Sequence, residues 1–270
     1  MDYFKIEKED LGKDSALPIL KLGDSGEVFY EIALRMVEEI EKNNKSNKKT
    51  VFIVPVGPVG QYPIFVRLVN SRKIDLKNTW FINMDEYLTN DKQYIDINSK
   101  LSFRGFMKRE VYDKIDKDLV MDKSHRIFPD PKAPDKILEK INELGGVDIC
   151  FGGIGITGHM AFNEPEDISI DEFKNKTTRV IEIAKETRCA NAIGDLNGAI
   201  SAMPKYAITV GMKEILGSRK IILGVFRDWH RAVVRETLYR EVTSNFPATF
   251  IQKHPDALII ANDNASKRPF

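Results

Sequence analysis

The chain has 270 residues, of which 42% are hydrophobic and 30% are charged, as in an ordinary globular protein. Lys and Arg number 41 against 40 Asp and Glu, and the resulting net charge of +1 gives no general attraction to nucleic acid or to an acidic membrane. The N-terminus MDYFKIEKED is too charged for a signal peptide, and no apolar run is long enough to span a membrane. We therefore expect a cytoplasmic protein with neither nucleic acid nor a membrane as a partner.

The two cysteines, Cys150 and Cys189, lie in apolar or mixed segments and lack CxxC spacing. This arrangement predicts neither a disulfide framework nor a zinc site, and it fits a reducing compartment. The sequence also contains no metal-ligand spacing and no GxSxG nucleophile motif, so we expect no bound metal.

Short β-branched runs alternate with amphipathic stretches along the whole chain. In chain order, the predicted elements are a helix at 31–43, strands at 51–56 and 79–87, a helix at 135–146, strands at 147–153, 206–211 and 220–226, a helix at 228–241, and strands at 247–252 and 257–263. Such alternation predicts an α/β fold with three layers, in which helices cover both faces of a mostly parallel, doubly wound, Rossmann-like sheet.

The chain contains no linker long enough to divide it, which predicts a single domain over residues 1–270. The polar, weakly periodic segment 164–205 is interpreted as an excursion over the top of the sheet or a mobile lid. In open α/β sheets, ligands bind beyond the carboxyl ends of the strands. Three predicted strands are followed by glycines, carboxylates or a histidine that could serve binding or catalysis. We expect the three loops to meet at one crevice.

The first of these loops is PVGPVG, which contains Gly57 and Gly60. Glycines let backbone N–H groups approach an anion at a helix N-terminus. Pro58 removes one donor, however, and the stretch lacks the Gly-Lys-Ser/Thr ending of a P-loop. A plain strand-to-helix turn and a phosphate site both remain open here, with the turn favoured.

The second loop, NMDEY, places Asp85 and Glu86 directly after an apolar run. Carboxylates that are buried at a strand end need partners, and they are good candidates for proton transfer. The alternative is a helix N-cap, where Asp is favoured in any case.

The third loop, GGIGITGHMAFNEP, places His159 and Glu164 five residues apart. A histidine oriented by a carboxylate is a common general acid–base pair, and a structural histidine bonded to the loop backbone is the alternative. The glycines of the loop indicate unusual backbone angles or close approach of a ligand. Those taken as candidate substrate-binding residues are Gly153, Gly155 and Gly158.

Taken together, these residues resemble the glucosamine-6-phosphate deaminase/isomerase family, which is related to the 6-phosphogluconolactonases. The resemblance is carried by FINMDEY (81–87), FGGIGITGHMAFNEP (151–165), ETRCAN (186–191), PKYAITVG (204–211) and KHP (253–255). These stretches follow the order of the family over roughly residues 25–263, and GHMAFNEP separates the deaminases from the lactonases.

The resemblance implies an enzyme that opens a sugar ring, isomerises the aldose to a ketose and releases ammonia from C2, without a metal or organic cofactor. By position, Asp85 would move a proton between C2 and C1, with Glu86 in support. His159 would assist ring opening and Glu164 would orient it. The partner would be a small-molecule sugar, and because the family is often oligomeric we expect a homo-oligomer.

The sequence departs from the family in two places. The family has an aspartate two residues before the histidine, and here Thr157 replaces it with an uncharged hydroxyl, which leaves His159 a weaker base. The Thr-Gly-Gly-Thr run of the family corresponds to residues 56–59, which lack hydroxyls; a family arginine falls on Ile193 and a family lysine on His230. Arg227 and Arg231, which flank that last position, are candidate substitutes for these phosphate-binding groups.

Because three phosphate-binding features change together, we hypothesise an amino-sugar isomerase/deaminase with an altered or unphosphorylated substrate. A non-catalytic sugar-binding or sensor protein on the same fold is the main alternative, favoured by the lost groups and disfavoured by the retention of Asp85, His159 and Glu164. A lactonase-type hydrolase is a third reading, which the AFNEP ending weighs against.

Overall fold

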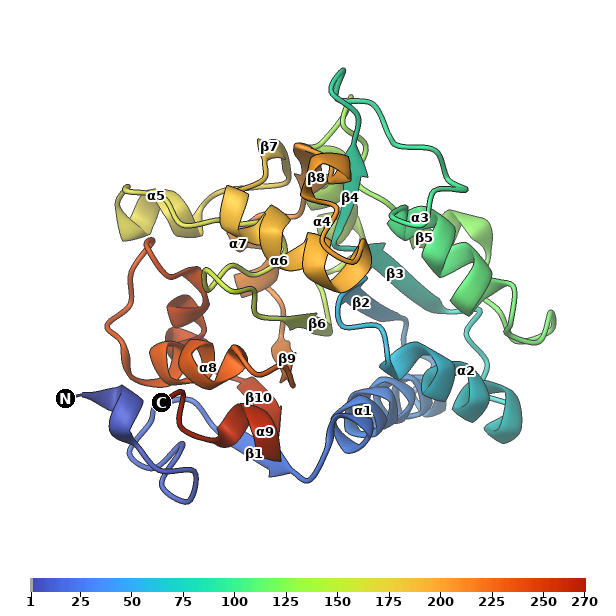
Figure 1. Ribbon diagram of the computed structural model, residues 1–270. Coiled ribbons are helices and arrows are strands. Elements are labelled where there is room, and N and C mark those ends of the chain that lie inside the picture. The colour runs from blue at the N-terminus through green and yellow to red at the C-terminus, as the bar shows by residue number, and fades with distance from the viewer. Residues whose placement is uncertain (1) are drawn as a thin grey trace.

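The computed structural model describes residues 2–270, whose strands form two sheets (Figure 1). The large sheet is parallel throughout and has the spatial order β1 (Ile19–Leu22), β10 (Ala257–Asn262), β9 (Lys220–Val225), β6 (Ile149–Gly153), β2 (Thr50–Val54), β3 (Thr79–Asn83) and β5 (Arg126–Ile127). The small sheet is antiparallel and has the order β4 (Asp85–Leu88), β8 (Tyr206–Thr209) and β7 (Arg179–Glu182).

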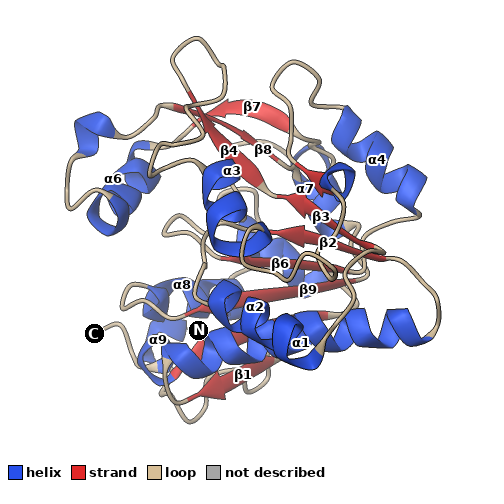
Figure 2. Cartoon of the chain, turned by 90° about the vertical axis from the view of Figure 1, so that its right-hand side faces the viewer, coloured by secondary structure: helices blue, strands red, loops and turns tan. Residues whose placement is uncertain are grey.

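Helices cover both faces of the large sheet, as the alternation of the sequence predicts (Figure 2). One face packs against α1 (Ser25–Lys45), α2 (Gln61–Arg72) and a π-helical turn, Met107–Tyr112. The other face packs against α4 (Lys136–Leu144), α7 (Met212–Leu216) and α8 (His230–Tyr239). Strand β2 is buried on both sides because its alternate side chains enter the two cores. The expected three-layer, mostly parallel α/β fold is confirmed.

Shorter elements complete the described chain. The remaining α-helices are α3 (Phe103–Phe106), α5 (Ile170–Lys174), α6 (Lys185–Asp195) and α9 (Asp263–Ser266), and 3-10 turns lie at Tyr3–Lys5, Lys123–His125, Ile200–Ala202 and Pro247–Lys253. The segment 164–205 therefore contains two helices and strand β7, which joins the small sheet. Its mobility remains a prediction.

The predicted strand 79–87 is in fact two strands in two different sheets. Strand β3 ends at Asn83, and β4 begins at Asp85 and pairs with β8 instead of β2. Met84 joins the sheets, because its N–H donates to Val54 O at 2.9 Å and its carbonyl accepts from Val210 N at 2.8 Å. A single apolar run cannot show this change of partner, since all the residues of β4 are buried too.

The strand prediction for residues 247–252 is wrong, since this stretch forms the 3-10 turn Pro247–Lys253. Proline at the start of the turn lacks a backbone donor and suits a helical first turn. Ala248 N–H then donates to Gly158 O at 2.7 Å, which ties the turn to the glycine-rich loop. Within residues 2–270, none of the helices has both the length and the apolar character that crossing a membrane requires.

Candidate active site

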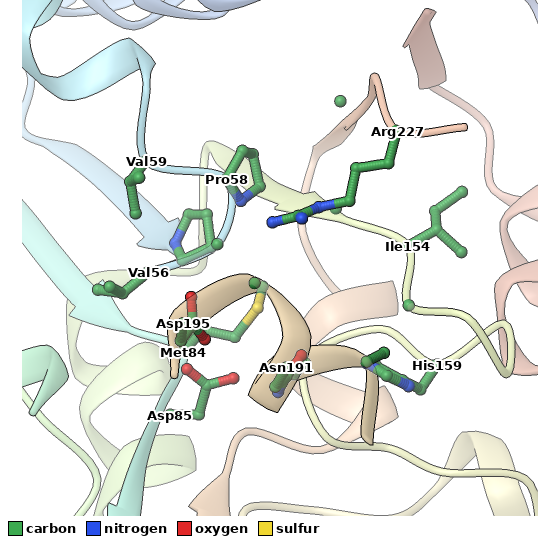
Figure 3. Close-up of a pocket in the computed structure, with 18 of the residues that line it drawn as sticks. Val56, Pro58, Val59, Met84, Asp85, Ile154, His159, Asn191, Asp195 and Arg227 are labelled. Carbon is green, nitrogen blue, oxygen red and sulfur yellow. The ribbon is translucent and has the colours of Figure 1, made fainter. Parts of the chain in front are cut away.

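A cavity of about 360 Å³ opens at the carboxyl ends of four neighbouring strands, β9, β6, β2 and β3 (Figure 3). The loops after these strands and the inner side of α6 form its walls. The lining residues used below are Val56, Gly57, Pro58, Val59, Gly60, Asp85, Tyr87, Gly153, Gly155, His159, Asn191, Gly194, Asp195, Arg227 and His230. The three loops expected to meet at one crevice therefore do so, because parallel strands deliver their ends to the same edge.

Asp85 lies where the chain leaves the large sheet, and its side chain faces the cavity. The residue is 8% exposed, and no hydrogen bond to its carboxylate was found among the described residues. Burial first, and then the charge of Glu86, raise the pKa of Asp85 to about 8. A carboxyl group tuned to this range can both take and return a proton near neutral pH.

Glu86 does not line the cavity, and the structure corrects its place in the site. It is fully buried, and its carboxylate accepts hydrogen bonds of 2.9–3.2 Å from Ser102 Oγ, from the backbone N–H groups of Tyr87, Phe103 and Arg104, and from Arg104 Nε. Glu86 thus fastens the start of α3 to β4. Its support for Asp85 is limited to the effect of its charge.

His159 lines the cavity, and three groups gather behind its ring at Nδ1. Thr157 Oγ1 lies 2.9 Å from this nitrogen, Thr187 Oγ1 3.2 Å and Glu164 Oε2 3.3 Å. Burial acts to raise the pKa of Glu164, but the charge of His159 and the hydrogen bonds from His159, Thr187 and Thr157 outweigh it and lower that pKa. Glu164 is therefore ionised at neutral pH and orients His159 from behind.

The glycines of this loop have different roles. A Cβ on Gly155 would lie 1.9 Å from His159 Cε1, so only glycine lets the imidazole lie against the loop. Gly153 also lines the cavity. Gly158 has a φ of +78° and faces Phe246, outside the cavity lining, which corrects its prediction as a substrate-binding residue.

The loop after β2 lines the cavity with Gly57 and Gly60, as expected, but its side chains are apolar. Val56, Pro58 and Val59 take the positions between and beside the glycines, and Val59 is 39% exposed. No hydroxyl from this loop is therefore available to a bound anion.

Arg227 follows β9 and extends towards Pro58 across the cavity (Figure 3). Its guanidinium lies 5.8 Å from the centre of the Phe226 ring and against Gly194 of α6. Asp195, at the end of α6, lies on the same rim; burial raises its pKa, while the charges of Arg227 and Lys100 act in the opposite direction. Arg227 and Asp195 thus lie near each other in the cavity wall.

His230, a candidate substrate-binding residue at the position of a family lysine, also borders the cavity, and both of its ring nitrogens have partners within the protein. The residue is 3% exposed, and Nδ1 accepts from the N–H groups of Phe226 and Arg227 at 2.9 and 2.8 Å. Its Nε2 donates to Ile154 O at 3.0 Å. Burial, followed by the charge of Arg227, lowers the pKa of His230 to about 3. The ring is neutral and fixes the two loops together.

Sequence reasoning missed three polar residues of the cavity wall, Tyr87, Asn191 and Asp195. Asn191 Nδ2 donates to Tyr87 Oη at 2.9 Å, a contact that joins α6 to β4. Both residues lie in the stretches FINMDEY and ETRCAN, so those motifs held the signal. Ile193, by contrast, is 71% exposed and lies outside the cavity lining. Among the residues that the structure describes, no group of three potential ligands is arranged to hold a metal ion.

Comparison with known proteins adds curated relatives, while no family model matches the chain. A glucosamine-6-phosphate deaminase of Lachnoclostridium phytofermentans is 31% identical over 211 residues, which cover 75% of this chain and 82% of the relative. The glucosamine-6-phosphate deaminase of Mycoplasma mycoides subsp. mycoides is 28% identical over 242 residues, which cover 88% and 93%.

Solved structures agree with these relatives. A monomeric glucosamine-6-phosphate deaminase superposes with a TM-score of 0.80 at 25% identity, covering 93% of this chain and 99% of the other. A 6-phosphogluconolactonase from Shewanella baltica shares the fold, with a TM-score of 0.65 at 13% identity, covering 91% and 97%. The fold is therefore one that 6-phosphogluconolactonases share, and the relatives mark the chain as an α/β enzyme of the amino-sugar deaminase class. Within that class, the chain belongs to the glucosamine-6-phosphate deaminase family.

Proposed function

We propose that this enzyme isomerises and deaminates an amino sugar whose end remote from C1 and C2 carries no phosphate. The main support is a contrast between two regions of the same cavity, the region with the acid–base groups and the region expected to bind a phosphate. The presence of Asp85 and the His159–Glu164 pair in the cavity supports proton transfer, and the loop after β2, which brings no hydroxyl, supports the absence of a phosphate.

The chemistry needs only two proton-moving groups. His159 takes the proton of the C1 hydroxyl through Nε2, the bond between C1 and the ring oxygen breaks, and the same proton passes to the ring oxygen. Asp85 then moves the proton of C2 to C1, and one proton of the C2 amine passes to the C1 oxygen, so that the C1 carbonyl becomes a hydroxyl and the C2 amine becomes an imine. Water adds to C2 and ammonia leaves, so that a ketose remains.

The residues around Arg227 suit an uncharged end of the sugar better than a phosphate. A phosphate dianion would meet the guanidinium of Arg227 but also the carboxylate of Asp195. An arginine and an aspartate suit a pair of hydroxyl groups as donor and acceptor. Val56 and Val59 then contact the carbon atoms of the sugar.

An ammonia-release assay with the purified enzyme tests this proposal. We expect turnover of at least one unphosphorylated amino sugar, such as glucosamine or galactosamine, with kcat/KM about tenfold or more above that for glucosamine 6-phosphate. A micromolar KM and normal turnover for glucosamine 6-phosphate would refute the altered substrate while leaving the deaminase reaction intact.

A variant that restores the family groups makes the test sharper. We expect Val56→Thr and Val59→Thr together to raise kcat/KM for glucosamine 6-phosphate, because they add two hydroxyls to the cavity lining. Asp195→Asn added to this variant should raise it further by removing the opposing charge. The same substitutions should lower kcat/KM for the unphosphorylated sugar.

A non-catalytic sugar sensor remains the competing proposal and gives a different result in the same experiment. It predicts calorimetric binding of an amino sugar without release of ammonia. The retained carboxylate and histidine favour the enzyme, because binding alone does not require a buried acid with a pKa of about 8.

A further inference from the structure

The replacement of the family aspartate by Thr157 leaves a specific arrangement at the back of His159. Thr157 Oγ1 donates to Glu164 Oε2 at 2.9 Å and lies 2.9 Å from His159 Nδ1. The carboxylate itself is 0.4 Å further from the ring nitrogen than the hydroxyl is, 3.3 Å against 2.9 Å. The hydroxyl and the carboxylate therefore both reach Nδ1, and the hydrogen bond from Thr157 joins them to each other.

A second hydroxyl reaches the same nitrogen from another element. Thr187 is fully buried on α6, and its Oγ1 lies 3.2 Å from His159 Nδ1. Helix α6 therefore contributes to the orientation of His159 as well as to the cavity wall. Two hydroxyls from separate elements enclose the ring nitrogen.

The hydrogen bonds around Thr157 indicate which ring nitrogen of His159 carries the proton. An ionised carboxylate only accepts hydrogen bonds, and a threonine hydroxyl has one hydrogen to donate. Because Thr157 gives its hydrogen to Glu164, its contact with His159 requires the hydrogen to lie on Nδ1. Nε2 of the neutral ring is then an acceptor, which is the form that can take a proton from a sugar hydroxyl.

We infer that Thr157 and Thr187 are positioning residues, which together with Glu164 hold neutral His159 in the tautomer with hydrogen on Nδ1. The inference deepens the proposed function, on which its kinetic consequence rests. The family aspartate would touch the imidazole directly with its own charge. Here a neutral hydroxyl takes the place of that aspartate while Glu164 stays 3.3 Å from Nδ1, so that orientation is kept while one charge beside the ring is lost.

The tautomer is tested without any substrate, by long-range proton–nitrogen NMR correlations of the ¹⁵N-histidine-labelled protein. We expect hydrogen on Nδ1 of His159 in the wild type and in Thr157→Ser, and a mixture of tautomers in Thr157→Val. Hydrogen on Nε2 in the wild type would overturn the inference. Because no turnover is measured, this result is independent of whether the proposed reaction is correct.

Kinetics provide the second readout. We expect Thr157→Val to lower kcat about 10- to 100-fold with little change in KM, the loss expected for one hydrogen bond to a charged network, and Thr157→Ser to restore it. Thr187→Val should have a smaller effect in the same direction and provides a second route if Thr157→Val fails to fold. Full kcat in both valine variants, each folded by circular dichroism, would refute the positioning role.

The chain offers a matched control in Thr178. This buried threonine also donates to a buried glutamate, Glu214, at 2.9 Å, but neither residue lines the cavity. Thr178→Val should lower thermal stability and leave kcat unchanged. An equal loss of kcat in Thr178→Val and Thr157→Val would assign both effects to general loosening of the fold and would overturn the inference.

Discussion

At the scale of single residues, the most informative group is the carboxyl of Asp85. Met84 carries the chain from the large sheet to the small one, and the next residue is buried at the cavity wall. Burial without a compensating cation favours the neutral acid, and the charge of Glu86 adds to this effect. The residue that we propose for proton transfer is therefore also one that destabilises the fold locally when it is ionised.

We predict that Asp85→Asn lowers kcat about 10²- to 10⁴-fold, since the amide cannot accept and return a proton. In the wild type, kcat/KM should rise with pH up to about 8, because the base works only when it is ionised. Ammonia release measured from pH 5 to 10 checks both expectations. Activity of Asp85→Asn equal to that of a variant of the exposed Asp118, Asp118→Asn, would contradict the assignment.

The same substitution should change stability with a definite dependence on pH. The folded-state pKa of Asp85 is raised above the unfolded value of about 3.9. Its contribution to stability is therefore present below about pH 4 and is lost as the pH rises to about 8. Asp85→Asn should melt at nearly the wild-type temperature at pH 4 and several degrees above it at pH 8. The opposite trend would show that the carboxylate has an unrecognised partner.

Gly155 sets the distance between the loop and the imidazole. We predict that Gly155→Ala lowers kcat/KM by about tenfold or more, because the new Cβ would lie 1.9 Å from His159 Cε1 and must displace the ring. Gly26→Ala, near the start of α1, is the control and should leave kcat/KM unchanged. Steady-state kinetics and melting temperatures of both variants separate displacement of the ring from loss of fold.

At the scale of secondary-structure elements, long periodic segments were predictable and short connecting ones were not. Helices α1, α4 and α8 agree with their predicted positions within a few residues, except that α1 starts earlier, at Ser25. The short strands β1, β5 and β7 were missed because runs of two to four half-buried residues have no clear period. Their strand geometry depends on neighbours that are distant in sequence.

Helix α3 depends on a single carboxylate from another element. We predict that Glu86→Ala lowers the free energy of unfolding by about 3 kcal/mol, because Arg104 and several backbone donors lose their acceptor in a buried place. Glu110→Ala is the control; its ion pair with Lys114 is exposed, and its loss should cost about 0.5 kcal/mol. Urea unfolding compares the two, and equal costs would contradict the role given to Glu86.

At the scale of the whole molecule, the two sheets share backbone hydrogen bonds through Met84. The small sheet has its own apolar cluster, which includes Tyr87 and Phe162, beside the two cores of the large sheet. The cavity lies between the large sheet and α6, and α6 packs in the apolar cluster of the small sheet. The large sheet and the small sheet must therefore both be folded for the site to exist. We propose that residues 1–270 form one cooperative domain.

A single thermal transition is the expected result for such a domain. Calorimetry should give a van't Hoff enthalpy equal to the calorimetric one, and Trp80 and Trp229 fluorescence should report the same midpoint as circular dichroism. Two separate transitions would show that the small sheet folds independently. The expected homo-oligomer is also a prediction, and sedimentation velocity at several concentrations gives the number of subunits.

The sequence by itself determined the α/β class and the meeting of three loops, and it proposed His159, Glu164 and Asp85 as the working groups, because hydrophobic periodicity and loop chemistry are local properties. Only the tertiary structure decided that Glu86 anchors α3, that His230 is a neutral buried clamp, and that Asp195 and Thr187 reach the site. Those roles depend on burial and on partners many residues away, which come together only when the strands and α6 have packed.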